Sequence, residues 1–235
     1  MISILSKIRR DLKEASDPKT KEVAQRFFKE PVKHYGVRTG VVVKIAKHHW
    51  KEAKNFSKKE IFELCEELYK SDYGEEAYVV ATWIPNLADQ FEEKDFKVFE
   101  HWVGSYINNW AKCDGFCNHS VGDFIEKFPK YIQELKRWAT SKNIWLKRAA
   151  AVSLIIPAKQ GKYLKDIFEI ADILLLDPHD MVQKGYGWML KEASRKHEKE
   201  VFDYVVHRKA NMPRTALRYA IELMPKKLKV EAMKR

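Results

Sequence analysis

Apolar residues recur along the chain with the spacing of amphipathic helices. In the segment 59–70 they fall at i, i+3, i+4 and i+7, which places them on one buried face. The segment 75–91 repeats the pattern, and Pro85 inside it predicts a kink. No segment sustains the period-two alternation of a strand. The best strand candidate is GVVVKIA at 40–46, for which a helix is an equally good interpretation.

Breakers and capping residues set the expected helix boundaries. Asn143 is placed to cap an apolar helix over 143–156, which should end near Pro157. Pro129 and Pro178 separate neighbouring helices elsewhere. The remaining helices are expected over 95–112, 116–128, 130–140, 162–176, 179–196, 198–208 and 213–224.

Paired helices of about 35–45 residues, joined by short polar connectors, are typical of HEAT-like repeats. We therefore expect an all-α chain with one domain over residues 1–235. It would be a HEAT-like helical-repeat solenoid, an alpha-alpha superhelix that curves around a concave basic face. An irregular helical bundle is the alternative, because the repeat is visible as element spacing and not as sequence identity. The basic segment 226–235 is expected to be a flexible tail.

Positive charge is concentrated at the two ends of the chain. The net charge is +11, with +9 over residues 1–60, −5 over 61–207 and +7 over 208–235. Such ends favour a polyanion as the partner. The alternative from charge alone is a basic protein whose lysine-rich faces are simply solvated.

Cysteine usage and hydropathy argue against several classes of protein. The odd number of cysteines, Cys65, Cys113 and Cys117, predicts no disulfide framework and fits a reducing cytoplasm. No apolar run approaches the length of a membrane span, and the one at the N-terminus is too short for a signal peptide. Cys113, Cys117 and His119 would supply too few ligands for a structural zinc site, so we expect no metal there. No G-x-x-x-x-G-K-[ST] phosphate loop occurs, and we expect no organic cofactor.

Three stretches contain residues suited to chemistry. Trp110 and Asp114 are four apart and share a helix face. Arg148 lies within an apolar helix, where its charge needs a phosphate or an internal salt bridge as partner. Trp188 and Lys191 are three apart on one face of a further helix. The alternative is a purely structural role, in which the tryptophans are core residues and Asp114 is a solvated residue near a helix end.

The order and spacing of several motifs resemble the AlkD-type DNA alkylation-repair glycosylase family, from about residue 20 to residue 224. The motifs are Y-G-V-R-T at 35–39, W-x-x-x-D at 110–114, G-D-F at 122–124, N-I-W-L-x-R-A-A at 143–150, Q-K-x-x-G-W-x-L at 183–190 and RTALRYAIE at 214–222.

This resemblance implies a monofunctional glycosylase that excises N3- and N7-alkylated purines from double-stranded DNA, acting as a cytoplasmic, nucleoid-associated monomer without an enclosing base pocket. Asp114 would be the catalytic carboxylate. Trp110 and Trp188 would flank it and contact the deoxyribose backbone, and Arg148 would hold a nearby phosphate. We expect further DNA contacts from Arg38, Lys147, Lys191, Arg214 and Arg218.

The chemistry of this substrate class needs few protein groups. A purine alkylated at N3 or N7 already carries positive charge, so it leaves without a general acid. The transition state resembles an oxocarbenium ion, as in other glycoside hydrolyses. One carboxylate near the sugar is enough to stabilise that charge or to orient water.

The chain departs from the family pattern just before the Q-K-x-x-G-W motif, where Asp180 and Met181 stand in place of two aromatic residues. Near the N-terminus, Phe27 and Arg38 replace a tyrosine and a polar amide. These departures bear on affinity, lesion preference and activity. Those at Asp180 and Met181 favour, as an alternative, a non-catalytic DNA-binding paralogue that recognises distorted or branched DNA. A protein-interaction scaffold is the second alternative.

Overall fold

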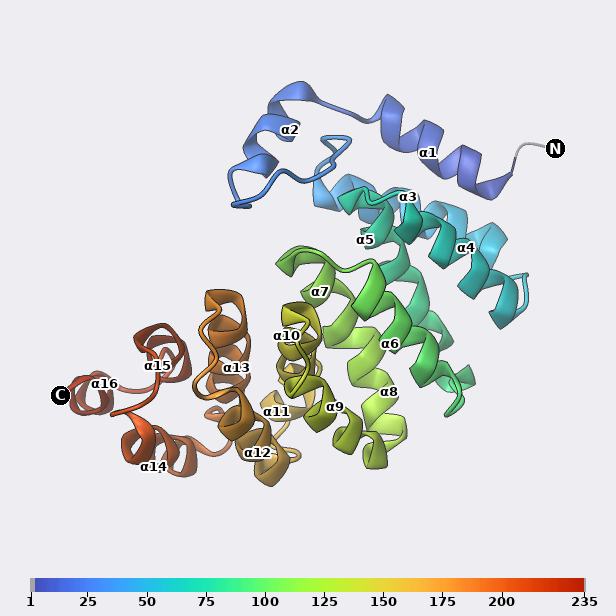
Figure 1. Cartoon of the computed structure of the whole chain (residues 1–235). Helices are drawn as coiled ribbons and strands as arrows, with labels where there is room; N and C mark the ends of the chain where they lie inside the picture. Colours follow the sequence, from blue (N-terminus) through green and yellow to red (C-terminus); the bar gives the residue numbers. More distant parts are fainter. Residues whose placement is uncertain (1–2, 235) are drawn as a thin grey trace. The chain divides into compact units, whose positions relative to one another are not determined.

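The computed structural model describes residues 3–234, in which the regular elements are helices (Figure 1). The prediction of an all-α chain is confirmed, and the fold is consistent with an alpha-alpha helical repeat. Within the described residues, extended pairing is limited to one isolated bridge between Lys33 and Tyr73. The segment 40–46, for which strand and helix were both open, lies in helix α3 (Thr39–Ala53).

The chain divides into two compact units between Phe116 and Cys117, and each is described by itself. In the first unit, α3 packs against α1 and α5, and α5 also contacts α4 and α7. Besides α3, its elements are α1 (Ile4–Glu14), α2 (Pro18–Gln25), α4 (Lys58–Lys70), α5 (Gly74–Trp83), the 3-10 helix η1 (Ile84–Gln90), α6 (Asp95–Ser105) and α7 (Trp110–Phe116).

The core of the first unit contains a cluster of aromatic rings. Rings from α4, α6 and α7 contact one another with centroids 5.5–6.0 Å apart. Such pairs contribute about 0.5–1.5 kcal/mol each beyond the burial of their area. The rings belong to Phe62, Tyr69, Phe99, Trp102 and Phe116.

In the second unit, α13 lies between α10 and α15, and α9 contacts α10 and α12. This packing of each helix pair on the next is typical of helical repeats. The elements are the π-helix η2 (Cys117–Val121), α8 (Gly122–Lys127), the 3-10 helix η3 (Pro129–Tyr131), α9 (Ile132–Ala139), α10 (Ile144–Val152), α11 (Ile155–Lys159), α12 (Leu164–Leu174), α13 (Asp180–Ala193), α14 (Glu198–Arg208), α15 (Arg214–Ala220) and α16 (Lys226–Met233).

The predicted boundaries hold in some places and shift in others. Asn143 caps α10 as predicted, because its Oδ1 accepts the N–H of Trp145 at 2.8 Å. The helix expected over 143–156 breaks earlier, after Val152. Pro157 supplies the reason, since a proline ring clashes with the carbonyl four residues before it, here that of Ser153. The helical pattern over 75–91 changes from α to 3-10 at Ile84, directly before Pro85.

The basic C-terminal segment contains a further helix. Residues 226–233 form α16, which contacts α14 and buries Ala232. The flexibility of the segment 226–235 stays a prediction. That the two units act as one domain stays a prediction.

Two further observations concern the cysteines and the hydropathy of the helices. The three cysteines are free and buried. Within residues 3–234, no helix combines the length and hydropathy that a membrane crossing needs.

Gly187 lies at a close approach of α13 to α15. A Cβ here would lie 2.7 Å from the Cβ of Tyr219 and 2.8 Å from the carbonyl oxygen of Ala216. The helix interior would otherwise prefer alanine by about 1 kcal/mol. The glycine is therefore explained by the close contact of the two helices.

We expect Gly187→Ala to destabilise the protein by about 1–3 kcal/mol, because backbone atoms of α15 must move. Gly40→Ala is the matched control, since Gly40 also lies in a helix but its Cβ position has nothing within 4 Å among the described residues. That control should leave stability unchanged or raise it by up to about 1 kcal/mol. Equilibrium urea unfolding measures both variants, and an equal loss in both would contradict the packing argument.

Candidate functional site

Trp110 begins α7 and is held by the loop that follows α2. Asn109 caps this helix, because its Oδ1 accepts the N–H of Lys112 at 3.0 Å. The indole Nε1 of Trp110 donates to the carbonyl of Phe27 at 3.2 Å. The same indole stacks on Phe28, with ring centroids 5.5 Å apart and 21° between the planes. Trp110 is thus fixed by a hydrogen bond at its edge and by a ring on one face.

A buried lysine anchors the first turn of α7 at a second point. Lys112 is 6% exposed, and its Nζ pairs with Asp72 at 2.6 Å and donates to Asn108 Oδ1 at 3.0 Å. Burial alone would raise the pKa of Asp72, but hydrogen bonds from Lys112 and Asn108 outweigh it and lower that pKa. The ion pair therefore joins α7 to the loop between α4 and α5.

Asp114 lies one helical turn after Trp110, on the same face of α7, and is half-buried. α7 packs on α5, where a Cβ at Gly115 would lie 3.7 Å from the Cβ of Ala81. The π-helical segment η2 follows directly after Phe116. Single π-helical turns are frequent at functional sites. The structure thus brings the W-x-x-x-D pair together on a short helix with two separate anchors.

The loop before α3 is held by the carboxylate of Glu75, in the first turn of α5. That carboxylate accepts the backbone N–H groups of Tyr35, Gly36 and Val37 at 3.1, 2.9 and 3.1 Å. Gly36 has a φ of 92°, a conformation that favours glycine. Burial alone would raise the pKa of Glu75, but these bonds and His34 bring it to about 2.

His34 links this anchor to the aromatic residues around Trp110. Its Nδ1 lies 3.6 Å from Glu75 Oε2, and its ring centroid is 5.5 Å from that of Phe28. Phe28 in turn stacks on Trp110. A continuous set of contacts therefore runs from the Glu75 carboxylate to the Trp110 indole.

In the second unit, Arg148 lies between α10 and α13. It is 5% exposed, and its Nη1 donates to the carbonyl of Met181. A Cβ at Gly185 would lie 3.2 Å from Cγ of Arg148, so the glycine makes room for the arginine side chain. The internal partner that an arginine in an apolar helix requires is thus, in part, a backbone carbonyl. A phosphate contact by Arg148 stays a prediction.

Two of the predicted DNA-binding lysines are already paired with carboxylates. Lys147 pairs with Asp177 at 2.6 Å, and Lys191 pairs with Glu222 at 3.1 Å. Both lysine side chains are mostly buried, at 23% and 16% exposed. Trp188 is half-buried on α13, one turn before Lys191.

The other three predicted arginines are more accessible. Arg38 precedes α3 and is exposed, as are Arg214 and Arg218 on α15. Arg214 reaches the carbonyl of Met233 at 3.4 Å, whereas Arg218 makes no ion pair with a residue that the structure describes. The predicted site residues are divided between the two units. Trp110, Asp114 and Arg38 lie in the first and the others in the second, so their convergence stays a prediction.

The departure at Asp180 has a local explanation. Asp180 lies in the first turn of α13, where a carboxylate is stabilised by the helix dipole. It also pairs with Lys184 at 3.2 Å.

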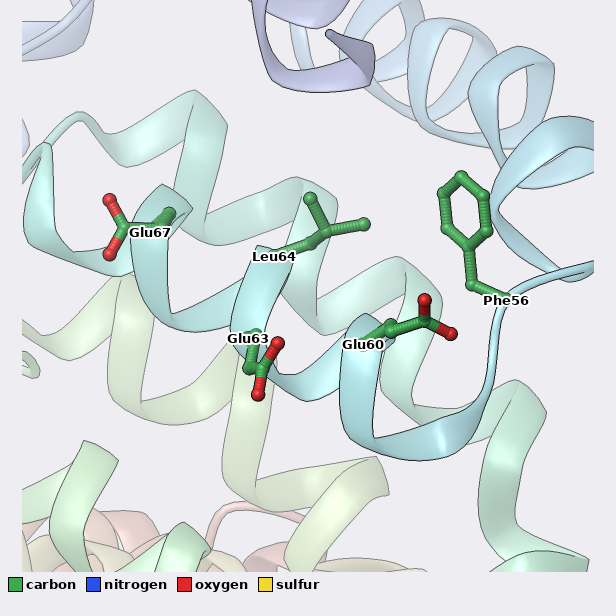
Figure 2. A pocket seen from close by; sticks show the side chains of 5 residues that line it. All are labelled: Phe56, Glu60, Glu63, Leu64 and Glu67. Carbon is green, nitrogen blue, oxygen red and sulfur yellow. The ribbon is translucent and has the colours of Figure 1, made fainter.

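A hollow on the surface of α4 is the wrong kind of site for a polyanion (Figure 2). Its carboxylates would repel phosphates, and one of them, that of Glu60, completes a capping box with Ser57. The hollow is lined by Phe56, Glu60, Glu63, Leu64 and Glu67. Among residues 3–234, no group of histidine, cysteine and acidic side chains is arranged to hold a metal ion.

Phe28, Glu75 and Lys112 position the candidate site and were not predicted from the sequence. Phe28 and Glu75 act across 82 and 39 residues of sequence, respectively, so no local spacing marks them. The only local signal is the pair of acidic residues at 75–76, which opens a helix otherwise rich in apolar residues.

Comparisons with known proteins identify the family and the fold. The sequence matches the model of the DNA alkylation repair enzyme family over residues 8–224. The structure is similar to one described as a predicted DNA alkylation repair enzyme from Enterococcus faecalis, with a TM-score of 0.80 and 16% identity over 90% of this chain and 97% of that chain. At that identity the likeness shows a shared fold. No curated protein matches the sequence.

We expect Glu75 to make stability fall in acid. Its pKa drops from an ordinary value of 4.5 to about 2 on folding. Its contribution is therefore fully present above about pH 4.5 and is lost as the pH falls towards about 2. Glu75→Gln should lower the free energy of unfolding by about 2–3 kcal/mol near neutral pH, because a neutral amide with one oxygen cannot replace a carboxylate that accepts three N–H bonds. The variant should also show a weaker loss of stability in acid.

Urea unfolding at about pH 7 and about pH 3 measures this difference. Glu63→Gln, on the exposed side of α4, is the control and should behave as wild type. If Glu75→Gln loses as much stability between the two pH values as wild type does, Glu75 is not the titrating anchor.

Proposed function

Because the chain belongs to the DNA alkylation repair enzyme family, which implies DNA as its partner, we propose that it hydrolyses the N-glycosidic bond of cationic N3- or N7-alkylated purines in duplex DNA. The observation that supports this most is the pair of Trp110 and Asp114 on α7, with Trp110 held from two sides. A hydrolytic site for a reactive substrate needs a fixed carboxylate more than it needs a deep pocket.

The alkylated base supplies the driving force for bond breakage. As the C1′–N bond breaks, its electron pair returns to the purine and neutralises the positive charge of the base. Charge then develops on the sugar, which resembles an oxocarbenium ion. Water adds to C1′ and loses a proton, so the products are the free base and an abasic site. No general acid is needed at any step.

Asp114 is proposed to stabilise the charge on the sugar and to orient the attacking water. A preorganised anion aimed at a developing cation is worth far more in a partly dry site than in water. The half-buried position of Asp114 on an anchored helix supports this role. Its carboxylate would also accept the proton that water releases.

Trp110 is proposed to form one wall around the sugar. Phe28 covers one face of the indole, so the opposite face is the one that would meet the deoxyribose. An aromatic face attracts a cation by about 0.5–2 kcal/mol. Trp188 would form the other wall, and Arg148 would hold a phosphate. Both roles rest on the motif resemblance.

We expect Asp114→Asn to lower release of 7-methylguanine and 3-methyladenine from methylated duplex DNA by about 100- to 1000-fold, as for the loss of one preorganised electrostatic group. Asp203→Asn, which removes a carboxylate paired with Lys199 on α14, should retain full activity. Chromatography of the released bases measures all three proteins. Equal release by wild type and Asp114→Asn, or none by either, would rule out the proposal.

A non-catalytic DNA-binding role is the second candidate, and the departures at Asp180 and Met181 favour it. It predicts salt-dependent binding of duplex or branched DNA with no base release by wild type. Binding and release measured on the same methylated duplex separate it from the glycosylase.

We expect Phe28→Ala to lower kcat by about tenfold with a smaller change in KM, because the Trp110 indole loses the ring that fixes it. A shift of about 1 Å in a group near the reacting atoms can lower the rate by tenfold or more. Phe28→Tyr keeps the stacked ring and should restore most of the activity. Single-turnover rates on methylated duplex measure the effect. A loss as large in Phe28→Tyr would show that Trp110 placement does not depend on the stack.

A further inference from the structure

Helix α3 carries a row of lysines on its outermost face. Lys44, Lys47, Lys51 and Lys54 follow one another at intervals of three, four and three residues, the spacing of a single helix face. All four are exposed, and Lys54 directly follows the last residue of α3. The opposite face is the buried one, formed by Val42, Ala46, His49 and Ala53. We refer to the four residues as the α3 lysine row.

The α3 lysine row is not neutralised within the protein. The only acidic residue of α3 is Glu52, and its carboxylate pairs with Lys7 at 2.8 Å. None of the four lysines makes an ion pair in the part of the chain that the structure describes. Lysines on other helices are equally exposed, yet each pairs with a carboxylate four residues on. These are Lys59, Lys165 and Lys199.

The N-terminal end of α3 extends the positive surface. Arg38 is exposed, and no described side chain caps the helix. A Cβ at Gly40 would meet nothing within 4 Å among the described residues, so the backbone there is open. Uncapped N–H groups and the helix dipole favour an anion at this end. Exposed cations are therefore present along the whole helix, from Arg38 to Lys54.

We propose that the α3 lysine row binds the phosphate backbone of duplex DNA. The proposal rests on the proposed function for the identity of the polyanion. It adds a contact surface outside the predicted site residues. Ten residues separate Lys44 from Lys54, which is about 15 Å along the helix axis, with one cation for each turn. A straight row of this kind fits a regularly charged strand, whereas a small anion needs donors that converge on one point.

The α3 lysine row is better suited to bind phosphates than lysines that already pair with carboxylates. Lys147 and Lys191 already interact with carboxylates, so moving them to phosphates would exchange one ion pair for another. Counterion release from DNA is driven by cations that are free in the unbound protein. The α3 lysine row has that property.

A membrane surface fits α3 less well. Interfacial helices place large apolar side chains beside their basic face. Among the described residues, the only exposed large apolar side chain of α3 is Val41, at 37%.

The test compares two triple variants that lose the same charge. One carries Lys44→Gln, Lys47→Gln and Lys51→Gln, and the control carries Lys59→Gln, Lys165→Gln and Lys199→Gln. Glutamine has nearly the helix propensity of lysine, so both should fold, and thermal unfolding checks this. Affinity for an unmodified duplex is measured by fluorescence anisotropy between about 50 and 200 mM salt.

We expect the row variant to have a log–log salt slope shallower by about 2–3, since each lost phosphate contact removes about 0.9. Its affinity at about 100 mM salt should fall by about 100-fold, whereas the control keeps the wild-type slope. Changing the same three residues to arginine should restore the slope. Equal slopes in the row variant and the control would overturn the proposal, as would wild type that shows no salt-dependent binding.

Two further readouts separate the proposals from each other. If the salt slope depends on the α3 lysine row but methylated duplex releases no base, the result supports DNA binding by the row and contradicts the proposed glycosylase activity. Base release by wild type, together with equal salt slopes for the row variant and the control, would support the glycosylase activity and contradict DNA binding by the row. A third outcome would contradict DNA as the partner of the row: wild type binds phosphatidylserine vesicles, the row variant does not, and the salt slopes for DNA are equal.

Discussion

Two adjacent buried carboxylates at the start of α5 hold together the part of the first unit that carries the candidate site. Glu76 is fully buried, accepts the hydroxyl of Tyr35 at 2.6 Å and pairs with Arg9 at 3.1 Å. Glu75 receives three backbone N–H groups from the same loop. Charges taken out of water are tolerated only when fully partnered. The loop must therefore adopt one path, and that path brings Phe27 and Phe28 to Trp110.

The distribution of charge has two different causes in this protein. Many lysines and arginines join one helix to another, as Lys112, Lys147 and Lys191 do, and their charge is used within the fold. Other cations, above all those of α3, have no such partner among the described residues. Net charge alone does not separate these groups. The basic surface available to a partner is thus defined by which cations the fold leaves unneutralised.

The helical class, the α10 cap at Asn143 and the shared face of Trp110 and Asp114 were predictable, because each depends on residues within about four positions of one another. The contacts of Phe28, Glu75 and Lys147 were not, because they join residues 30 or more positions apart. Helix α16 was not predicted either, since the basic composition of 226–235 is typical of a tail.

The burial of all three cysteines matters for a protein of this family. Alkylating agents attack thiolates as well as purine nitrogens, and only the deprotonated thiol is a strong nucleophile. Burial raises the pKa of the Cys65 thiol, so the reactive form is scarce, and Cys113 and Cys117 are equally inaccessible to solvent. Burial thereby keeps all three thiols out of contact with electrophiles dissolved in the solvent.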